Sequence, residues 1–336
     1  MKFPLNYIIY EVTGKCNLRC RYCYNIWKIP GGEHPAPGAT YHQSIKTLKR
    51  LFRMADIHHV SFTGGEPFLS ERFEELVLFT RLKRKSVTVI TNGSGATEEK
   101  YAQLIKMGVD LFELPVHSHL EDTHDQITRV EGSWKRSVDS IKFLRANGAY
   151  VVPVVVITKI NAGQIRETIR FLHELGCRQI MLNRYNIGGE GFSQQEEILA
   201  SPALLKQTYG EANSLALELD VKLSSNVCTP HCVLKPADFP NIAFGNCSRD
   251  VRRMPITVDV SGNIRLCNHS PVVAGNIFRQ NLEEIFSSDH AKNWLCDVPA
   301  FCTNCAAYDR CLGGCRAAAL QAGGALSDPD PLVTFL

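Results

Sequence analysis

The hydrophobic positions of the 336-residue chain follow two patterns that alternate along its first part. Short runs of β-branched and aromatic residues are typical of strands. Between them, apolar residues recur every three or four positions, as Ile45, Leu48 and Phe52 do, which predicts amphipathic helices. Strands are predicted at 6–12, 59–63, 87–90, 111–116, 151–157 and 179–182. Helices are predicted at 41–55, from Ser70 to about Arg84, from Thr97 to Gly108, from Ser133 to Gly148 and at about 164–175.

Six strands that alternate with helices predict right-handed βαβ units and a parallel sheet, either left open or curved into a partial barrel. In both forms, the loops that follow the strands gather at one rim of the sheet. Two of these loops carry candidate chemistry, at 13–23 after the first strand and at 64–67 after the second. We therefore expect these two loops to share the rim.

The alternation stops after residue 191. One further helix is predicted at about 203–219, and the rest of the chain has little periodicity but holds nine of the 13 cysteines. Because few apolar runs are available there to build a core, we expect metal clusters to hold this region together. The predicted division is a core domain at 1–200, a connecting helix at 201–226 and a cluster-binding domain at 227–336.

Composition narrows the classes of function. The formal net charge is +3, from 37 basic and 34 acidic residues, which gives no signal for nucleic-acid or membrane binding. No apolar run reaches the roughly 18 residues of a membrane span, and Pro4 and Asn6 interrupt any signal-peptide core. We therefore expect a cytoplasmic protein, whose thiols stay reduced. Its cysteines then predict metal binding rather than disulfides.

Three cysteines, Cys16, Cys20 and Cys23, form a C-x3-C-x2-C array in the loop after the first strand. Three thiolates so close together are typical ligands of one soft metal centre, and a 4Fe-4S cluster is favoured. Three ligands would leave one iron open for chemistry. The alternatives are buried thiols, which the polar residues of the loop disfavour, and a zinc site completed elsewhere.

Other residues at the predicted rim are candidates for contacts to a bound molecule. Gly64 and Gly65 would let backbone carbonyls approach a ligand ammonium closely, although an ordinary turn has the same composition. Tyr22 could pack on the face of a base or in the core. Polar residues at the ends of later strands could meet ligand oxygens or serve as turn and ion-pair residues: Asn92, Ser118 and Arg184.

The cysteine array after a first strand, an aromatic residue before its third cysteine and a G-G-E-P sequence after a second strand together resemble the radical S-adenosylmethionine (SAM) superfamily. The resemblance implies a partial (βα)6 TIM-like barrel with a 4Fe-4S cluster on Cys16, Cys20 and Cys23, and with the amino and carboxylate groups of SAM on the fourth iron. It also implies that the reduced cluster cleaves SAM to a 5'-deoxyadenosyl radical, which abstracts hydrogen from a substrate. The residues expected to contact SAM are Tyr22, Gly64, Gly65, Glu66, Pro67, Asn92, Ser118 and Arg184.

The C-terminal cysteines form a C-x2-C-x5-C-x3-C array from Cys302 to Cys315, which is preceded by Cys247 and by a G-x4-C sequence that ends at Cys267. This pattern resembles the SPASM extension of radical SAM enzymes, which holds two auxiliary clusters. By that resemblance, the first cluster is held by Cys247, Cys267 and Cys315, with Cys228 or Cys232 as the fourth ligand. The second takes Cys302, Cys305 and Cys311. The chain lacks the further cysteine that the family supplies after residue 315. The fourth ligand of the second cluster would then be Cys296, whichever of Cys228 and Cys232 the first cluster does not use, Asp328 or Asp330. Alternatively, the fourth iron would stay open. Cys177, alone between a helix and an apolar strand, is expected to be a buried small hydrophobe.

The function expected from the resemblance is hydrogen abstraction from a peptide or protein side chain, which leads to oxidation or a crosslink. The expected partners are that substrate, a low-potential electron donor such as flavodoxin or ferredoxin, and a separate leader-peptide-binding protein, because few residues precede the first strand. One alternative is radical modification of a small molecule such as a tetrapyrrole or sugar. A basic patch for its carboxylates would come from Arg184, Arg249, Arg252 and Arg253. The other alternative is a non-catalytic iron-sulfur protein for electron transfer or scaffolding.

Overall fold

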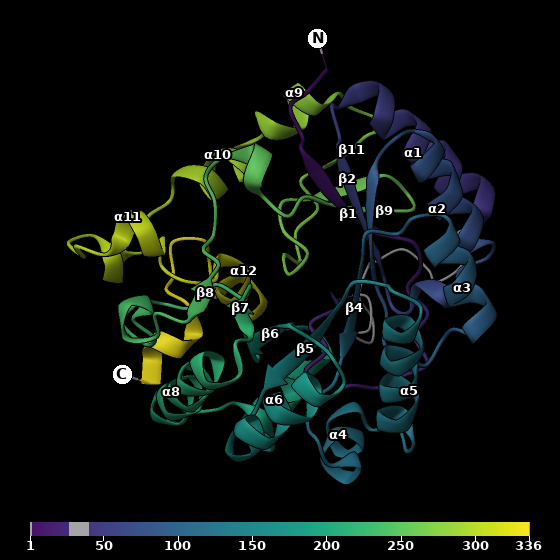
Figure 1. The fold of residues 1–336 in the computed structure, drawn as a ribbon. Helices are drawn as coiled ribbons and strands as arrows, with labels where there is room; N and C mark the ends of the chain where they lie inside the picture. Colours follow the sequence, from purple (N-terminus) through teal and green to yellow (C-terminus); the bar gives the residue numbers. More distant parts are fainter. Residues whose placement is uncertain (1, 27–39, 336) are drawn as a thin grey trace.

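Six parallel strands form the centre of the structure, a computed structural model that describes residues 2–26 and 40–335 (Figure 1). The strands lie side by side in chain order, and each runs parallel to the next. Their bounds are β1 Tyr7–Glu11, β2 His59–Thr63, β3 Ser86–Ile90, β4 Leu111–Pro115, β5 Val151–Ile157 and β6 Gln179–Arg184. The prediction of six parallel strands in a partial barrel is therefore confirmed.

Helices cover the outer face of these strands, as Figure 1 shows. Each turns an apolar face inward; Leu48 and Leu51 of α1, for example, are fully buried in the main core. Thr40 begins α1 with a capping box, and the Thr97 side chain caps α3. The helices of this part are α1 Tyr41–Met54, α2 Phe73–Leu82, α3 Glu98–Lys106, α4 Glu121–Thr128, α5 Ser133–Ala146 and α6 Ile165–Glu174. Those that follow are α7 Gln195–Ile198, α8 Pro202–Leu219, α9 Leu282–Phe286, α10 Asp289–Cys296, α11 Tyr308–Cys311 and α12 Arg316–Gln321.

Two local predictions differ from the structure. Ser70 does not cap α2; it ends a short 3-10 helix at Pro67–Leu69, and α2 begins after Arg72, whose φ of 54° is left-handed. The reason is that Pro67 starts a separate turn, which uses the residues expected to open the helix. Helix α4 was not predicted, because its eight residues hold few apolar positions.

The sheet extends beyond the six predicted strands at both edges. Strands β7 Lys222–Ser225 and β8 Ile242–Phe244 continue it after β6, in parallel. At the other edge, β9 pairs with β1 in parallel, and β10 and β11 follow as antiparallel strands, with bounds β9 Thr257–Asp259, β10 Asn263–Arg265 and β11 Gly275–Asn276. The described residues thus form one open sheet of eleven strands with β11 and β8 at its ends. This one sheet crosses both predicted domain boundaries, near residues 200 and 226.

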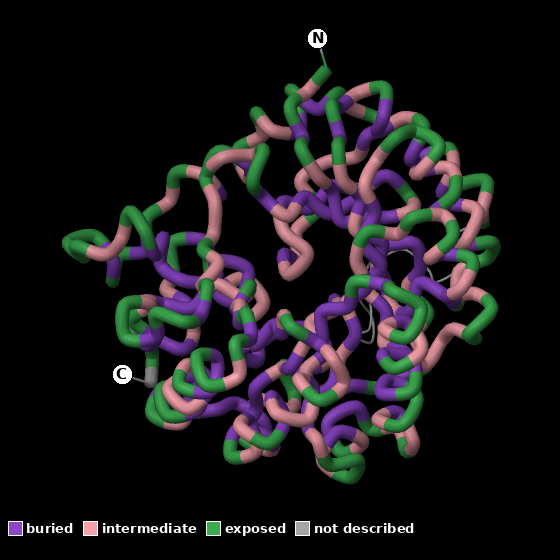
Figure 2. Tube along the Cα trace, in the orientation of Figure 1, coloured by how far each residue is buried: buried purple, intermediate pink, exposed green. Residues whose placement is uncertain are grey.

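The C-terminal region contributes apolar residues to the main core, which the shortage of apolar runs in its sequence did not predict. Ile256, Val258 and Ile264 are fully buried in the same cluster of side chains as the strands of the barrel. Figure 2 shows buried residues along the strands and exposed residues on the outer helices. No helix within residues 2–26 and 40–335 combines the length and the hydropathy that a membrane crossing requires.

Candidate functional site

A cavity of about 560 Å³ lies between the carboxyl ends of the barrel strands and the C-terminal region. Its size is typical of ligand pockets, which span about 300–1,000 Å³. The cysteine loop and Gly64 to Gly65 line it on one side, and a second group of cysteines lines it on the other. The two loops expected at one rim of the sheet therefore do meet there.

The three-cysteine loop is held by backbone and side-chain hydrogen bonds. Cys20 and Cys23 are buried and Cys16 is half-buried, and all three line the cavity. The Cys16 Sγ accepts hydrogen bonds from the backbone N–H of Leu18 at 3.4 Å and from Nδ2 of Asn92 at 3.7 Å. Donors of this kind orient a sulfur ligand.

Gly64 and Gly65 allow the second loop to pack directly against the cysteine loop. The N–H of Gly65 donates to the carbonyl of Thr13 at 2.7 Å. A Cβ on Gly65 would lie 2.0 Å from the Lys15 carbonyl oxygen, and one on Gly64 would lie 2.3 Å from that of Thr13. Gly64 also has a φ of +146°, which favours glycine. The glycines are thus required for contact between the two loops.

Glu66 and Pro67 directly follow the two glycines but do not line the cavity. The fully buried Glu66 carboxylate accepts hydrogen bonds from the Thr91 hydroxyl and from the N–H of Asn92, both at 2.7 Å. Burial raises the pKa of Glu66 to about 7, although these donors act in the opposite direction. Glu66 thereby fixes Asn92, which does line the cavity.

Tyr22 lies beside the three cysteines, with its hydroxyl 2.9 Å from Nε2 of His117. Burial, together with the charges of the neighbouring cysteines, raises its pKa well above the usual value, so the hydroxyl stays protonated. Nδ1 of His117 accepts from the Val156 N–H at 3.2 Å, which leaves Nε2 as the donor to Tyr22. This part-buried contact fixes the tyrosine ring at the wall of the cavity.

Two of the expected SAM contacts have their polar atoms engaged elsewhere. Ser118 does not line the cavity, and its hydroxyl donates to Oε1 of Gln164 at 2.6 Å. Arg184 lines the cavity but is buried, forms an ion pair with Asp330 and donates to the Cys228 carbonyl at 2.8 Å. An arginine bound in this way cannot turn to a ligand carboxylate without leaving Asp330 unpaired.

Cys228, Cys247, Cys267 and Cys315 form one group of thiols on the far wall of the cavity. A hydrogen bond to Cys247 and burial raise the pKa of Cys228, and the charges of Cys315 and Cys267 raise it further. Burial likewise raises the pKa of Cys315 to about 11. Thiols whose pKa is raised in this way, as in Cys228 and Cys315, remain neutral unless a cation such as iron supplies the compensating charge.

Cys232, Cys302, Cys305 and Cys311 form a second group, outside the cavity. The backbone N–H of His231 donates to the Cys311 Sγ at 3.3 Å, which brings residue 232 beside this loop. Burial raises the pKa of Cys302 to about 11, and the charges of Cys311, Cys305 and Cys232 add to that rise. The two neighbouring cysteines, Cys228 and Cys232, therefore belong to different groups.

Neither group has the geometry of a site for a single ion. Within the described ranges, no three His, Cys, Asp or Glu side chains converge closely enough to hold one metal ion. Four thiolates around one zinc would each lie about 2.3 Å from it. An iron-sulfur cubane holds its thiolates farther apart, because each binds a different iron. The donor set, all sulfur and in groups of three and four, fits iron-sulfur clusters.

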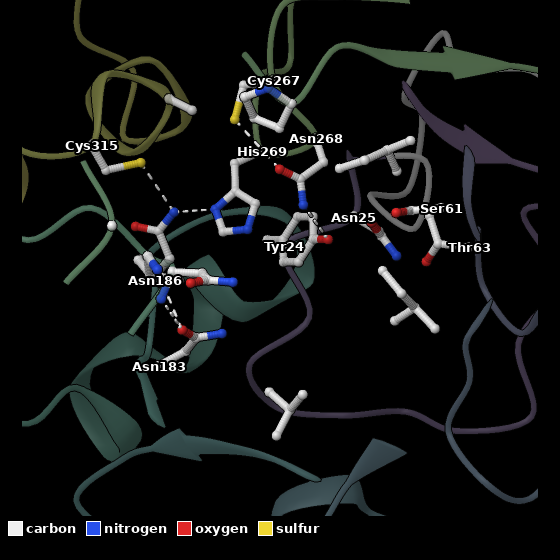
Figure 3. Close-up of a pocket in the computed structure, with 18 of the residues that line it drawn as sticks. Tyr24, Asn25, Ser61, Thr63, Asn183, Asn186, Cys267, Asn268, His269 and Cys315 are labelled. Atoms are coloured by element: carbon white, nitrogen blue, oxygen red, sulfur yellow. Dashed lines mark hydrogen bonds between the residues drawn. The ribbon is translucent and has the colours of Figure 1, made fainter. Parts of the chain in front are cut away.

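A network of polar side chains behind the first auxiliary group was not predicted from the sequence. Asn186 donates to the Cys315 Sγ at 3.3 Å and also contacts His269, which packs on the ring of Tyr24 (Figure 3). Burial, with Arg184 and Arg265 nearby, lowers the pKa of His269 to about 3, so its ring is neutral. The sequence signal that could have indicated this network is the position of His269, two residues after Cys267.

Comparison with known proteins agrees with this geometry. A sequence profile of the radical SAM superfamily matches residues 10–172, and one for an iron-sulfur cluster-binding domain, SPASM, matches residues 247–311. The chain is 24% identical to a PqqA peptide cyclase of Gluconobacter oxydans, over 98% of this chain and 90% of that protein. It is 21% identical to an AdoMet-dependent heme synthase of Oleidesulfovibrio alaskensis, over 98% and 87%. It is 25% identical to the subtilosin biosynthesis protein AlbA of Bacillus subtilis, over 94% and 68%.

Solved structures with the same fold include radical SAM enzymes with bound peptides. SuiB of Streptococcus suis bound to its precursor peptide has a TM-score of 0.75 at 15% identity, over 99% of this chain and 76% of that one. The enzyme anSMEcpe with AdoMet and a peptide has a TM-score of 0.76 at 15% identity, over 99% and 95%. The chain is thus an enzyme of the radical SAM superfamily with a SPASM domain, and its cofactors are SAM, a 4Fe-4S cluster and auxiliary iron-sulfur clusters.

Proposed function

We propose that this enzyme removes a hydrogen atom from a peptide or protein side chain and that the product is an oxidised or crosslinked residue. The observation that carries the proposal is that one cavity is lined both by the three-cysteine loop and by the first auxiliary group of cysteines. A substrate in this cavity would lie between a site where hydrogen is removed and a site that can receive an electron. When bound, the cluster and SAM supply a 5'-deoxyadenosyl radical as the hydrogen acceptor.

We assign the radical cluster to Cys16, Cys20 and Cys23, because these thiols share the cavity with the glycine loop. Tyr22, Gly64, Gly65 and Asn92 are the proposed SAM contacts, since all four line or border the same space. Glu66 and Pro67 would not contact SAM themselves, and would instead position the residues that do. We leave Ser118 and Arg184 out of the SAM site, because their polar atoms already bind Gln164 and Asp330.

We assign the two auxiliary clusters to two complete sets of four cysteines. The first set is Cys228, Cys247, Cys267 and Cys315, and the second is Cys232, Cys302, Cys305 and Cys311. Of the other candidates, Asp330 pairs with Arg184, and Asp328 accepts a hydrogen bond from the Ala325 N–H at 2.7 Å. Cys296 is exposed at the end of α10. Neither cluster then has an open iron, which favours electron transfer as their role.

The polar lining of the cavity supports a peptide as substrate. Seven asparagines of the described part of the chain line it, and amide groups can both donate to and accept from peptide groups: Asn25, Asn92, Asn183, Asn186, Asn226, Asn246 and Asn268. The relatives named as a peptide cyclase and a bacteriocin biosynthesis protein also support a peptide substrate. An external low-potential electron donor, such as flavodoxin or ferredoxin, and a separate leader-binding protein remain part of the proposal.

A tetrapyrrole or another small polycarboxylate is less well supported, despite the relative named as a heme synthase. The basic patch expected for such a substrate does not assemble. Of the four arginines considered, only Arg184 and Arg253 line the cavity, and Arg184 is paired with Asp330. Arg252 instead pairs with Asp250 on the surface, and Arg249 donates to the Tyr308 hydroxyl.

The proposal is tested with the anaerobically reconstituted enzyme, SAM and dithionite. We expect 5'-deoxyadenosine by liquid chromatography in the unaltered enzyme and in Cys296→Ala, and none in Cys20→Ala. Synthetic peptides encoded by short reading frames beside the gene are then added. Mass spectrometry should detect a peptide that has lost hydrogen atoms. Release of 5'-deoxyadenosine by Cys20→Ala, or turnover of porphyrin substrates but of no peptide, would contradict the proposal.

A further inference from the structure

Glu113 is the only carboxylate among the described residues that line the cavity. It lies in the middle of β4, where its neighbours Phe112 and Leu114 are fully buried on the side that faces the helices. Because successive side chains of a strand point to opposite faces, Glu113 and Pro115 point into the barrel. The exposed part of Glu113 is therefore exposed to the cavity and not to the outer surface.

Among the residues that the structure describes, none in the wall around Glu113 is a partner for its carboxylate. Its strand neighbours in register are Ile90 on β3 and Val152 on β5, and neither β3 nor β5 carries a titratable side chain. Within residues 2–26 and 40–335, the Glu113 side chain forms no hydrogen bond and no ion pair. Arg184 in the same cavity is paired with Asp330, and Arg316 donates to the Trp294 carbonyl at 2.7 Å.

Burial raises the pKa of Glu113 to about 7. Among the described residues, the other titratable or charged groups that line the cavity come from β1, β6, α12, the 3-10 helix Val251–Arg253 and the loops: three tyrosines, seven cysteines, His269, Arg184, Arg253 and Arg316. A carboxylate without a partner in apolar surroundings is costly, and an opposite charge placed beside it offsets that cost. A cationic group that enters the cavity would therefore both bind to Glu113 and favour its ionised form.

We propose that Glu113 selects substrates whose side chain in the barrel is cationic, as in lysine or arginine. The inference rests on the proposed peptide-modifying function and adds to it the chemical class of a residue that enters the cavity. A bound ammonium or guanidinium would donate charge-assisted hydrogen bonds to the carboxylate. Pro115, Val154 and Met181, which line the same wall, would contact the aliphatic part of that side chain.

The test measures binding of small probes to the anaerobic holoenzyme by isothermal titration calorimetry. The probes are n-butylammonium and n-butylguanidinium, with 1-butanol as the neutral control. At pH 8 we expect at least one of the two cations to bind about ten- to a hundredfold more weakly to Glu113→Gln than to the unaltered enzyme. Glu98→Gln, at an exposed position in the first turn of α3, should bind as the unaltered enzyme does.

A pH series on the unaltered enzyme tests the inference without any substitution. The carboxylate ionises as the pH rises through about 7, so cation binding should strengthen between pH 6 and pH 8 and that of 1-butanol should not. Equal binding of 1-butanol and both cations, or equal cation binding by Glu113→Gln, would overturn the inference. Cleavage of SAM by the unaltered enzyme is a separate measurement, so failure here is distinguishable from failure of the proposed function.

Discussion

A separation of a few residues divides the C-terminal cysteines between two groups. Cys228 and Cys232 are four positions apart, and their spacing alone left open which of them completes the first auxiliary set. The structure turns the chain between them, so that Cys228 lies with Cys247 while the backbone at His231 bonds to Cys311. The sequence could supply the candidates but not this separation, because a turn of a few residues sets it.

Replacing Cys232 by alanine should damage one auxiliary cluster and leave the radical cluster intact. Three 4Fe-4S clusters correspond to about twelve irons per chain, and we expect a fall toward about eight, or a changed electron paramagnetic resonance spectrum if the cluster stays with an open iron. Iron analysis and spectra of the reduced protein measure this. Cys296→Ala is the matched control, and an unchanged iron content and spectrum in Cys232→Ala would assign the ligand elsewhere.

The partners of single side chains also could not be predicted from the sequence, and this affects the expected SAM contacts. Ser118 follows β4 and Arg184 ends β6, and both carry polar groups suited to ligand oxygens, but in the structure these groups contact Gln164 and Asp330. Glu113 was not predicted, because its alternation with Phe112 and Leu114 indicates the face of the strand it occupies but not that a cavity lies on that face. Its role depends on the shape of the cavity, which only the assembled barrel defines.

At the scale of elements, the helices and strands of the barrel were predictable because each has a clear period. The bounds of β2 and β5 agree with the prediction residue for residue. Strands β7 to β11 were not predicted, since they have two to four residues each and show no alternation. Such short strands form because an existing sheet edge offers them hydrogen bonds, which is a tertiary effect.

The contact between the glycine loop and the cysteine loop makes a clear prediction. Gly65→Ala would place a methyl group within 2.0 Å of the Lys15 carbonyl, so the cysteine loop must move. We expect a loss of about 1–3 kcal/mol of stability and a large fall in SAM cleavage. The thermal midpoint and the rate of 5'-deoxyadenosine release measure the two effects.

Gly210→Ala is the matched control for that substitution. Gly210 lies within α8, and a Cβ there would meet nothing within 4 Å. Alanine should therefore raise stability by about 0.5–1 kcal/mol and leave SAM cleavage unchanged. A Gly65→Ala enzyme as active and stable as the unaltered one would show that the two loops need not touch.

For the whole molecule, two buried ion pairs tie the C-terminal region to the barrel. Arg184 of β6 pairs with Asp330, and Glu11 of β1 pairs with Arg265 of β10. The side chains of Arg184 and Asp330 are each only 1% exposed. These pairs join opposite edges of the six-stranded barrel to residues far along the sequence, which no local pattern can predict.

Asp330→Ala should be strongly destabilising, because it leaves Arg184 buried without a counter-charge. The expected loss is about 3–5 kcal/mol, and the first auxiliary cluster should be lost more readily, since Arg184 also bonds to the Cys228 carbonyl. Denaturant unfolding and iron release on mild heating measure these effects. The control is Asp289→Ala, whose side chain is 97% exposed, and equal stability of the two variants would contradict the importance of the pair.

The extension of the sheet at both edges has a consequence for synthesis of the chain on the ribosome. The six barrel strands emerge first, but the partners of β1 and β6 lie at 257–259 and 222–225, so both edges stay unpaired until those residues appear. Unpaired edges are templates for association with other chains. The nascent barrel therefore depends on its later residues for protection from aggregation, before any cluster is inserted.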